Sequence, residues 1–285
     1  MPSLFTVTGR DVLFAHWPVD PDVLDGRLPE AFVPETFDGS AWVSALALEN
    51  GPVGPGSPSW LSSLSSASPP APSVGDRSWV GPLGGVPQLN FRTYVTVDGG
   101  DAAGVYFLSL DSARRATAAA GRRLFGLPCH HASMRLTRRG DRFTFQSHRR
   151  GRDTPAAAFQ ARYRPTGETY RADPRTLEAL CVEQSRYYFP ATEDHRFDVL
   201  RSGARDCVRV GRIDREPWEL RPVEATIRRN TLFEAAGLPA PSTAPVVQYS
   251  PGFAMGVEPL ETRDADADVD VDVDVDVDTV TVAGP

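Results

Sequence analysis

The chain has 285 residues, of which 41% are hydrophobic and 24% charged, and this composition is typical of a folded globular protein. Its net charge of −7 is unevenly spread, because residues 261–285 carry nine acids and one arginine and leave the rest of the chain at about +1. A nearly neutral body gives no reason to expect nucleic-acid or membrane binding, and no apolar run is long enough to span a bilayer.

The predicted elements of the first half are mostly strands. Strand patterns occupy residues 11–17, 41–49, 88–97 and 104–111. Asp20 followed by Pro21 predicts a short helix within 20–29. Residues 50–88 are rich in Gly, Pro and Ser, so we expect a long loop that is either disordered or docks as a flap.

The chain after residue 111 adds two longer helices and more strands. Residues 112–126 favour a helix that Asp111 caps and Gly126 ends, and residues 172–189 favour a second helix that Asp173 caps. A short helix is predicted at 230–237. Strands are predicted at 130–139, 141–150, 157–165, 197–203, 207–214 and 244–260.

This order predicts the fold class. Because strands mostly follow strands, we predict a mainly β, α+β fold in which a large antiparallel sheet is curled or doubled and two or three helices lie outside. The last segment, 261–285, alternates Asp with Val or Ala, and its charge density favours an expanded, solvated tail.

Five segments together resemble the YqjF-like family, a domain of unknown function in the acetoacetate decarboxylase-like superfamily. They are LNFRTYV (89–95), GVYFLSLDS (104–112), GLPCHHASM (126–134), RYRPTG (162–167) and EPWELRPVEATI (216–227). The resemblance implies one domain over residues 1–260, built as a strongly curved β-cone or barrel that encloses a ligand cavity.

The stretch GRRLFGLPCHHA (121–132) is also similar to a motif of the decarboxylases, Gly-Arg-x-x-x-Gly-x-Pro-Lys-Lys, whose first lysine forms a Schiff base. By this resemblance Cys129 and His130 stand at the two lysine positions. All 30 Lys+Arg residues of the chain are arginine, so no side-chain amine is available for an imine. The resemblance therefore supports the fold and the place of the pocket, and it does not supply the reaction.

Cys129 and His130 are the candidate catalytic residues, the first as a thiolate nucleophile and the second as a proton-transfer group. The alternatives are a cysteine that fills a gap in the core and a hydrogen-bonded core histidine. His131 shares a strand face with Cys129 and is a candidate ligand-binding residue.

Three further ligand-binding candidates lie on one face of the strand 88–97, namely Asn90, Arg92 and Tyr94. Arginine presents a rigid fork that matches a carboxylate, so Arg92 could anchor an anion inside the sheet. The alternative is that this face is simply the solvated side of the sheet. His16, in the first strand, is a candidate for the mouth of a cavity.

We therefore expect a protein whose internal cavity binds a small carboxylated or carbonyl compound. Whether it is an enzyme is left open: it is a lyase or hydratase without Schiff-base chemistry, a non-catalytic binding or sensing module, or an interaction protein that acts through its acidic tail. Three cysteines without framework spacing and no signal-peptide pattern predict a cytoplasmic location. No cofactor and no metal are predicted, and a homo-oligomer is left open.

Overall fold

The computed structural model describes residues 3–51, 54–55, 85–97, 102–150, 154–190 and 207–264. Most of the predicted loop 50–88, the predicted strand 197–203 and the tail beyond Asp264 lie outside these ranges. None of the described helices is long and apolar enough to cross a membrane.

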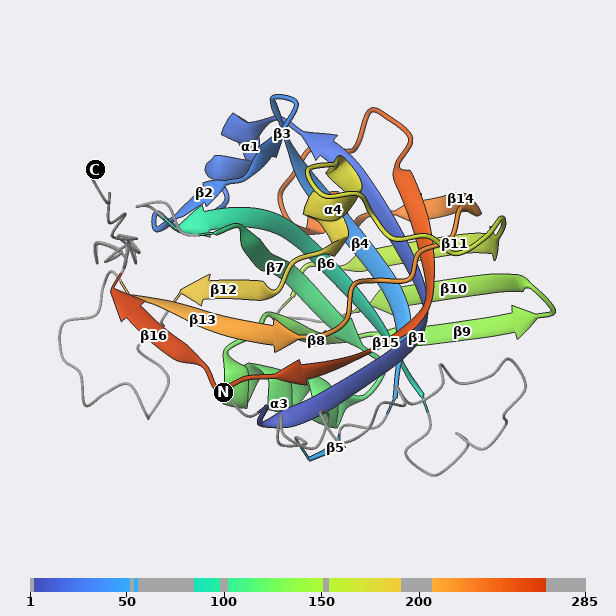
Figure 1. Cartoon of the computed structure of the whole chain (residues 1–285), viewed down its shortest axis with the longest axis horizontal. Coiled ribbons are helices and arrows are strands. Elements are labelled where there is room, and N and C mark those ends of the chain that lie inside the picture. The colour runs from blue at the N-terminus through green and yellow to red at the C-terminus, as the bar shows by residue number, and fades with distance from the viewer. Residues whose placement is uncertain are drawn as a thin grey trace, which may run out of the picture.

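Twelve strands form the larger of two sheets. They are β1 (Phe5–Val19), β2 (Phe32–Pro34), β3 (Thr36–Phe37), β4 (Ser40–Asn50), β5 (Gly54–Pro55), β6 (Val86–Val97), β7 (Gly104–Ser112), β8 (Cys129–His131), β12 (Arg186–Pro190), β13 (Cys207–Asp214), β15 (Val246–Val257) and β16 (Glu261–Asp264). The path runs β2-β6-β4-β1-β15-β13-β12-β7-β8, and β6 also pairs with β7. That extra pairing closes β6, β4, β1, β15, β13, β12 and β7 into a ring (Figure 1).

The mainly β fold class is confirmed, and the pairing adds one detail. Most neighbouring strands are antiparallel, as in the long pairings of β1 with β15 and with β4. However, β7 runs parallel to both β12 and β8, so the large sheet is mixed. β8 follows β7 through the crossover helix α3, whereas β12 comes from a distant part of the chain, and no local sequence pattern records its pairing with β7.

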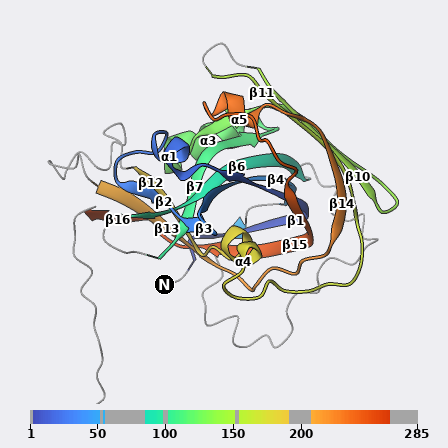
Figure 2. The ribbon, with the colours of Figure 1, turned by 90° about the horizontal axis from the view of Figure 1, so that it is seen from above.

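A smaller sheet of four strands packs outside the ring. Its order is β14 (Val223–Asn230), β11 (Ala157–Pro165), β10 (Arg142–Arg149) and β9 (Ser133–Arg139). The turn between β9 and β10 contains Gly140 at φ 63°, a conformation that favours glycine. Seen from above, β10, β11 and β14 curve around one side of the ring (Figure 2).

The helices are short and peripheral: α1 (Pro21–Asp25), α3 (Arg115–Phe125), α4 (Leu177–Val182) and α5 (Leu232–Ala235). Two predicted features are confirmed, since the Asp20 side chain accepts from the amide of Asp22 and Gly126 ends α3 at φ 66°. The predicted caps Asp111 and Asp173 are wrong. The residue at the N-cap of α3 makes no side-chain cap bond, and Thr176 caps α4.

The predicted helix 172–189 is also too long. After α4 ends at Val182, residues 186–190 form β12, which pairs with β13 and β7. Tyr187, Tyr188 and Phe189 are aromatic residues that suit a strand, and all three are buried there. Sheet pairing and burial therefore override the helical pattern.

The ring strands separate two hydrophobic clusters. On β1, Leu13 and Trp17 belong to the cluster that joins the ring to Phe145 and Phe159 of the smaller sheet. Phe14, on the opposite face of β1, belongs to the cluster inside the ring. We call this second group the interior cluster. Because β1 is buried on both faces, its sequence shows no clean alternation of polar and apolar residues.

Candidate functional site

Polar side chains cross three neighbouring strands on the inner face of the ring. His16 of β1 is opposite Ser44 of β4, and Ser44 is opposite Arg92 of β6. Directly opposite residues point to the same side of a sheet, so the three side chains share one face. Tyr94 follows two positions after Arg92, shares that face and belongs to the interior cluster. We call His16, Ser44, Arg92 and Tyr94 the interior polar row; all four are buried, with Arg92 the most exposed at 9%.

Hydrogen bonds connect the row to α4. His16 Nδ1 lies 2.6 Å from Ser44 Oγ, which lies 2.7 Å from the Tyr94 hydroxyl oxygen. The Tyr94 hydroxyl donates to the carbonyl oxygen of Cys181 at 2.7 Å. Two proton arrangements satisfy these contacts. With Nδ1 protonated, His16 donates to Ser44 and Nε2 is an acceptor; with Nε2 protonated, Ser44 donates to Nδ1 and Nε2 is a donor on the side of Gln248.

Arg92 carries a buried positive charge at the end of α4. Its Nη2 donates to the carbonyl oxygen of Cys181 at 2.7 Å, where a cation is favourable because helix carbonyls end unpaired. Its guanidinium also lies 5.6 Å from the centre of the Tyr94 ring. Within the described residues Arg92 makes no ion pair with an acid, and its Nε has no hydrogen-bond partner.

Burial sets the charge state of His16. Burial and, to a smaller extent, the positive charge of Arg92 lower the pKa of His16 to about 3, and a side-chain hydrogen bond with Gln248 acts in the opposite direction. The imidazole is therefore neutral throughout the physiological range. Burial likewise raises the pKa of the Tyr94 hydroxyl, which stays protonated.

Gln248 of β15 lies beside the row. Its amide nitrogen donates to Glu178 Oε1 at 3.1 Å, and the Tyr170 hydroxyl donates to the same oxygen at 3.0 Å. Its own Oε1 is buried and, like His16 Nε2 and Arg92 Nε, has no hydrogen-bond partner of normal geometry among the described residues. Buried polar atoms are nearly always bonded, and His16 and Gln248 also interact with each other, so Arg92 Nε is the atom of the three that stands apart.

The structure brings together three of the predicted ligand-binding residues, His16, Arg92 and Tyr94. Asn90 lies farther along β6, where it is half-buried and accepts from the side chain of Gln88 at 2.7 Å. His131 lies on β8, outside the row.

The sequence analysis missed Ser44 and Gln248. Ser44 lies in a strand that is buried on both faces, so alternation cannot mark a polar side there. The signal that remains is a single small polar residue between apolar ones on one face, which is also common in ordinary packed strands. Gln248 can be assigned to the inner face of the ring only from the register of β15 with β1, in which it is opposite Phe14.

Cys129 lies against α3. It packs with Leu110 and Ala118 in a small apolar cluster, and burial raises the pKa of its thiol to about 11. Its backbone carbonyl accepts from the guanidinium of Arg122. These surroundings favour a neutral thiol that packs as a small apolar group.

We expect Gly121→Ala to test this packing. A Cβ at Gly121 would lie 2.4 Å from Cys129 Sγ. An alanine in a helix normally stabilises by about 1 kcal/mol relative to glycine, yet here we expect a loss of about 1–3 kcal/mol in the free energy of unfolding. Urea denaturation of the single variants and of the double variant with Cys129→Ala measures the coupling. The loss should shrink by at least about 1 kcal/mol when the sulfur is removed, and an unchanged loss would contradict this placement.

His130 lies beside a buried ion pair. It is opposite Asp111 of β7, which binds Arg149 of β10 at 2.8 Å with both side chains 3% exposed or less. Burial lowers the pKa of His130 to about 4, and the charges of Arg149 and Arg122 act in the same direction. Burial raises the pKa of Asp111 to about 6, and Arg149 opposes that rise. No recorded hydrogen bond among the described residues connects His130 with the interior polar row.

A hollow of about 300 Å³ adjoins the turn that precedes Cys129. It is bordered by residues 126–128, by β7 and by the end of β12. Phe107, Leu127 and Phe189 line it and also pack in the interior cluster. Arg27 is the one charged residue among its described lining. Leu108 and Ala236 also line it and pack in the cluster outside the ring, and no residue of the interior polar row lines it.

Known proteins resemble this chain in sequence and in fold. Residues 6–66 and 77–254 match the DUF2071 family, described as an uncharacterized conserved protein. The uncharacterized protein YqjF of Bacillus subtilis (strain 168) is 32% identical over 243 residues, which are 85% of this chain and 86% of YqjF.

Among solved structures, the enduracididine biosynthesis enzyme MppR with HEPES buffer bound superposes with a TM-score of 0.58 at 12% identity, over 94% of this chain and 90% of that one. MppR complexed with pyruvate gives 0.53 at 13% identity, over 92% and 91%. Acetoacetate decarboxylase from Legionella pneumophila gives 0.54 at 13% identity, over 92% and 87%. At such identities the likeness concerns the fold, and it confirms the predicted acetoacetate decarboxylase-like architecture.

Proposed function

Because the chain belongs to the DUF2071 family and shares the fold of acetoacetate decarboxylase-like enzymes, we propose that it binds a small carboxylated or carbonyl compound inside its strand ring. The ligand would lie against the interior polar row. One solved protein of this fold is described as a complex with pyruvate, an acid of the proposed kind.

The observation that carries this proposal is the buried guanidinium of Arg92. A buried charge is stable only when it is paired or fully hydrogen-bonded. Arg92 has one carbonyl partner, and its Nε has none among the described residues. A ligand carboxylate would supply the missing charge and would match the fork of the guanidinium.

The remaining unsatisfied atoms narrow the ligand class. His16 Nε2 and Gln248 Oε1 have no hydrogen-bond partner of normal geometry among the described residues, and their side chains are close enough to affect each other, so a donor placed between them would complete their bonding. A ligand that carries a hydroxyl group next to its acid, or the enol or hydrate of a keto acid, offers such a donor. Short hydroxy and keto acids therefore complement the row better than a plain carboxylic acid.

A non-catalytic binding module is favoured by one feature. General bases work best with a pKa near the working pH, whereas burial lowers the pKa of His16 to about 3. A lyase or hydratase reaction is the enzymatic alternative, in which His130 and Cys129 stay predictions from the resemblance. Action through the acidic tail also stays a prediction, since the tail beyond Asp264 lies outside the described residues.

We expect a short hydroxy or keto acid to stabilise the protein in an Arg92-dependent way. At 100 times its dissociation constant a ligand adds about 2.7 kcal/mol to the free energy of unfolding. A thermal-shift screen that begins with pyruvate and lactate should find such an acid, and Arg92→Met should abolish its effect.

Arg215→Met is the matched control. Arg215 also binds the end of α4, through the Val182 carbonyl at 2.7 Å, but it already has Glu183 as an acidic partner at 2.9 Å. We expect Arg92→Met and Arg215→Met both to lower the melting temperature of the protein without ligand. Only Arg92→Met should abolish the stabilisation by the acid. An equal response in the two variants, or no response of the parent protein to any acid, would contradict the proposal.

A further inference from the structure

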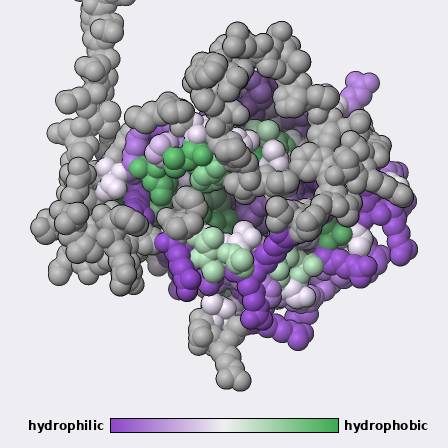
Figure 3. Space-filling model, turned by 90° about the horizontal axis from the view of Figure 1, so that it is seen from below, coloured by the Kyte–Doolittle hydropathy of each residue, from purple (hydrophilic) through white to green (hydrophobic). Residues whose placement is uncertain are grey.

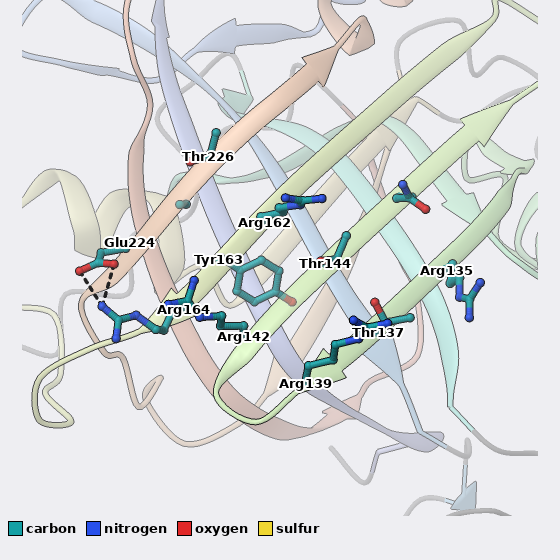
Figure 4. Close-up of a pocket in the computed structure, with 12 residues that line it drawn as sticks. Arg135, Thr137, Arg139, Arg142, Thr144, Arg162, Tyr163, Arg164, Glu224 and Thr226 are labelled. Carbon is teal, nitrogen blue, oxygen red and sulfur yellow. Dashed lines mark hydrogen bonds and ion pairs between the residues drawn. The ribbon is translucent and has the colours of Figure 1, made fainter.

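The outer face of the smaller sheet gathers arginines in one hollow. Figure 4 shows Arg135 and Arg139 on β9, Arg142 on β10, and Arg162 and Arg164 on β11. The hollow has a volume of about 710 Å³. Seen from below, hydrophilic residues predominate on the side of the molecule where Figure 1 places β9 and β10 (Figure 3). This face lies outside the ring and is separate from the interior polar row.

Four of these arginines have no acidic partner within the described residues. Arg164 is the exception: it donates to Glu224 at 2.9 Å and lies 3.9 Å from Asp141. Glu224 is the one acid in the described lining of the hollow, so the face carries an excess of positive charge.

The strand register places like charges together. Arg139 is directly opposite Arg142 where the hairpin of β9 and β10 closes. Like charges in directly opposite positions destabilise a sheet. An anion that bridges the two guanidinium groups would remove this repulsion.

A row of hydroxyl groups lies between the arginines. Thr137 is opposite Thr144, Thr144 is opposite Arg162, and Arg162 is opposite Thr226. Arg139 lies two positions beyond Thr137 in one direction along β9, and Arg135 lies two positions beyond it in the other. Outward positions two residues apart on a strand are about 6.5–7 Å apart. Arg139 and Arg142 therefore lie on one side of this row and Arg135 on the other, while Arg162 belongs to the row itself.

We propose that this face binds a small molecule that carries at least two phosphate groups. One phosphate would lie between Arg139 and Arg142, and a second near Arg162 and Arg135. Arginine matches phosphate through parallel hydrogen bonds, and the threonine hydroxyls complete the contacts. Two anionic groups fit an arrangement in which Arg139 and Arg142 form one positive group and Arg162 and Arg135 form a second one.

The described lining does not favour a single-stranded nucleic acid. Such partners need exposed aromatic rings on which their bases stack. Tyr163 is the one aromatic residue in the described lining, and it is 2% exposed. The Tyr163 hydroxyl donates to the backbone carbonyl of Asp11 in β1, at 2.9 Å. The aromatic side chain of Tyr163 therefore points toward the larger sheet and away from the hollow.

Isothermal titration calorimetry of the full chain with tripolyphosphate and with orthophosphate tests the proposal. At constant ionic strength, tripolyphosphate should bind at least about tenfold more tightly than orthophosphate, because it engages several guanidinium groups at once. Arg142→Gln and Arg162→Gln should each weaken tripolyphosphate binding by about tenfold or more.

Matched controls use exposed arginines elsewhere. Arg115→Gln and Arg123→Gln remove exposed charges from α3, and neither should change tripolyphosphate binding by more than about twofold. Equal weakening by the α3 variants would overturn the proposal, as would equal affinity for the two phosphates. Binding that appears only after residues 265–285 are deleted would also overturn it, because the chain's own acidic tail would then be the occupant.

Discussion

Arg149→Met is expected to lower the free energy of unfolding by about 3–5 kcal/mol at pH 7, because it leaves one half of a buried ion pair without its partner. Arg149 and Asp111 are 3% and 1% exposed, and their 2.8 Å contact holds β10 of the smaller sheet against β7 of the ring. The variant also loses the bond from Arg149 Nε to the carbonyl of Pro155. Urea denaturation measures the loss.

The loss in free energy of unfolding caused by Arg149→Met should increase with pH. Burial already raises the pKa of Asp111 to about 6, and Arg149 limits that rise. Without Arg149 the carboxyl favours its protonated form even more in the folded protein. A raised carboxyl pKa stabilises the fold below the unfolded value and loses that contribution as the pH rises through the folded value. The deficit of Arg149→Met should therefore be larger at pH 7 than at pH 5.

Arg164→Met is the matched control on the outer face of the same sheet. Arg164 contacts Glu224 in the solvent, where ion pairs contribute little. We expect no measurable change of stability from this variant. Equal losses for Arg149→Met and Arg164→Met would show that Asp111 and Arg149 are not a buried pair.

The second large expected effect is a decrease in the free energy of unfolding at acid pH, and its cause is the buried neutral side chain of His16. A histidine with a lowered pKa stays neutral in the folded protein and binds a proton in the unfolded chain below about pH 6.5. Its contribution is therefore complete above pH 6.5 and is lost as the pH falls toward the folded value of about 3. Between pH 6.5 and pH 4 this loss amounts to about 3 kcal/mol.

His16→Gln removes the titrating group and keeps a side chain that can bond Ser44. The stability of the parent protein should fall by about 3 kcal/mol more than that of the variant between pH 7 and pH 4. His130→Gln is the comparison, with an effect of the same sign and smaller size because His130 is only half-buried. Parallel curves for the parent protein and His16→Gln would mean that the imidazole is not buried in a neutral state.

The sequence predicts the elements of this fold better than their pairing. The strands around 11–17, 41–49, 88–97 and 104–111 are all present. The pairings of β1 with β15 and of β7 with β12, which the ring needs in order to close, are contacts between distant segments. Because many arrangements satisfy the same local pattern, the sequence alone cannot select this one.

The stretch after α4 shows how local signals compete. Leu177, Leu180 and Cys181 fit a helical stripe, and the same periodicity continues weakly to Gln184. The aromatic residues that follow have a strong preference for strands, and β13 offers them a partner. A prediction from local periodicity takes no account of β13 as a partner strand, so it makes the helix too long.

Part of the site was predictable for a physical reason. Arg92 and Tyr94 lie on one strand, and their common face follows from the two-residue period. His16 joins them only through the register of β1 with β4 and of β4 with β6. Ser44 links them because it is small and lies between the two larger groups, and a sequence pattern cannot report that position.

The central claim is that the strand ring retains a small acid at Arg92. Mass spectrometry of the small molecules released from natively purified protein tests it most directly. We predict about one equivalent of a short hydroxy or keto acid from the parent protein and from Arg215→Met, and a loss of at least about tenfold from Arg92→Met. Release of the same compound in equal amount from Arg92→Met, or of compounds without an acid or carbonyl group, would contradict the claim.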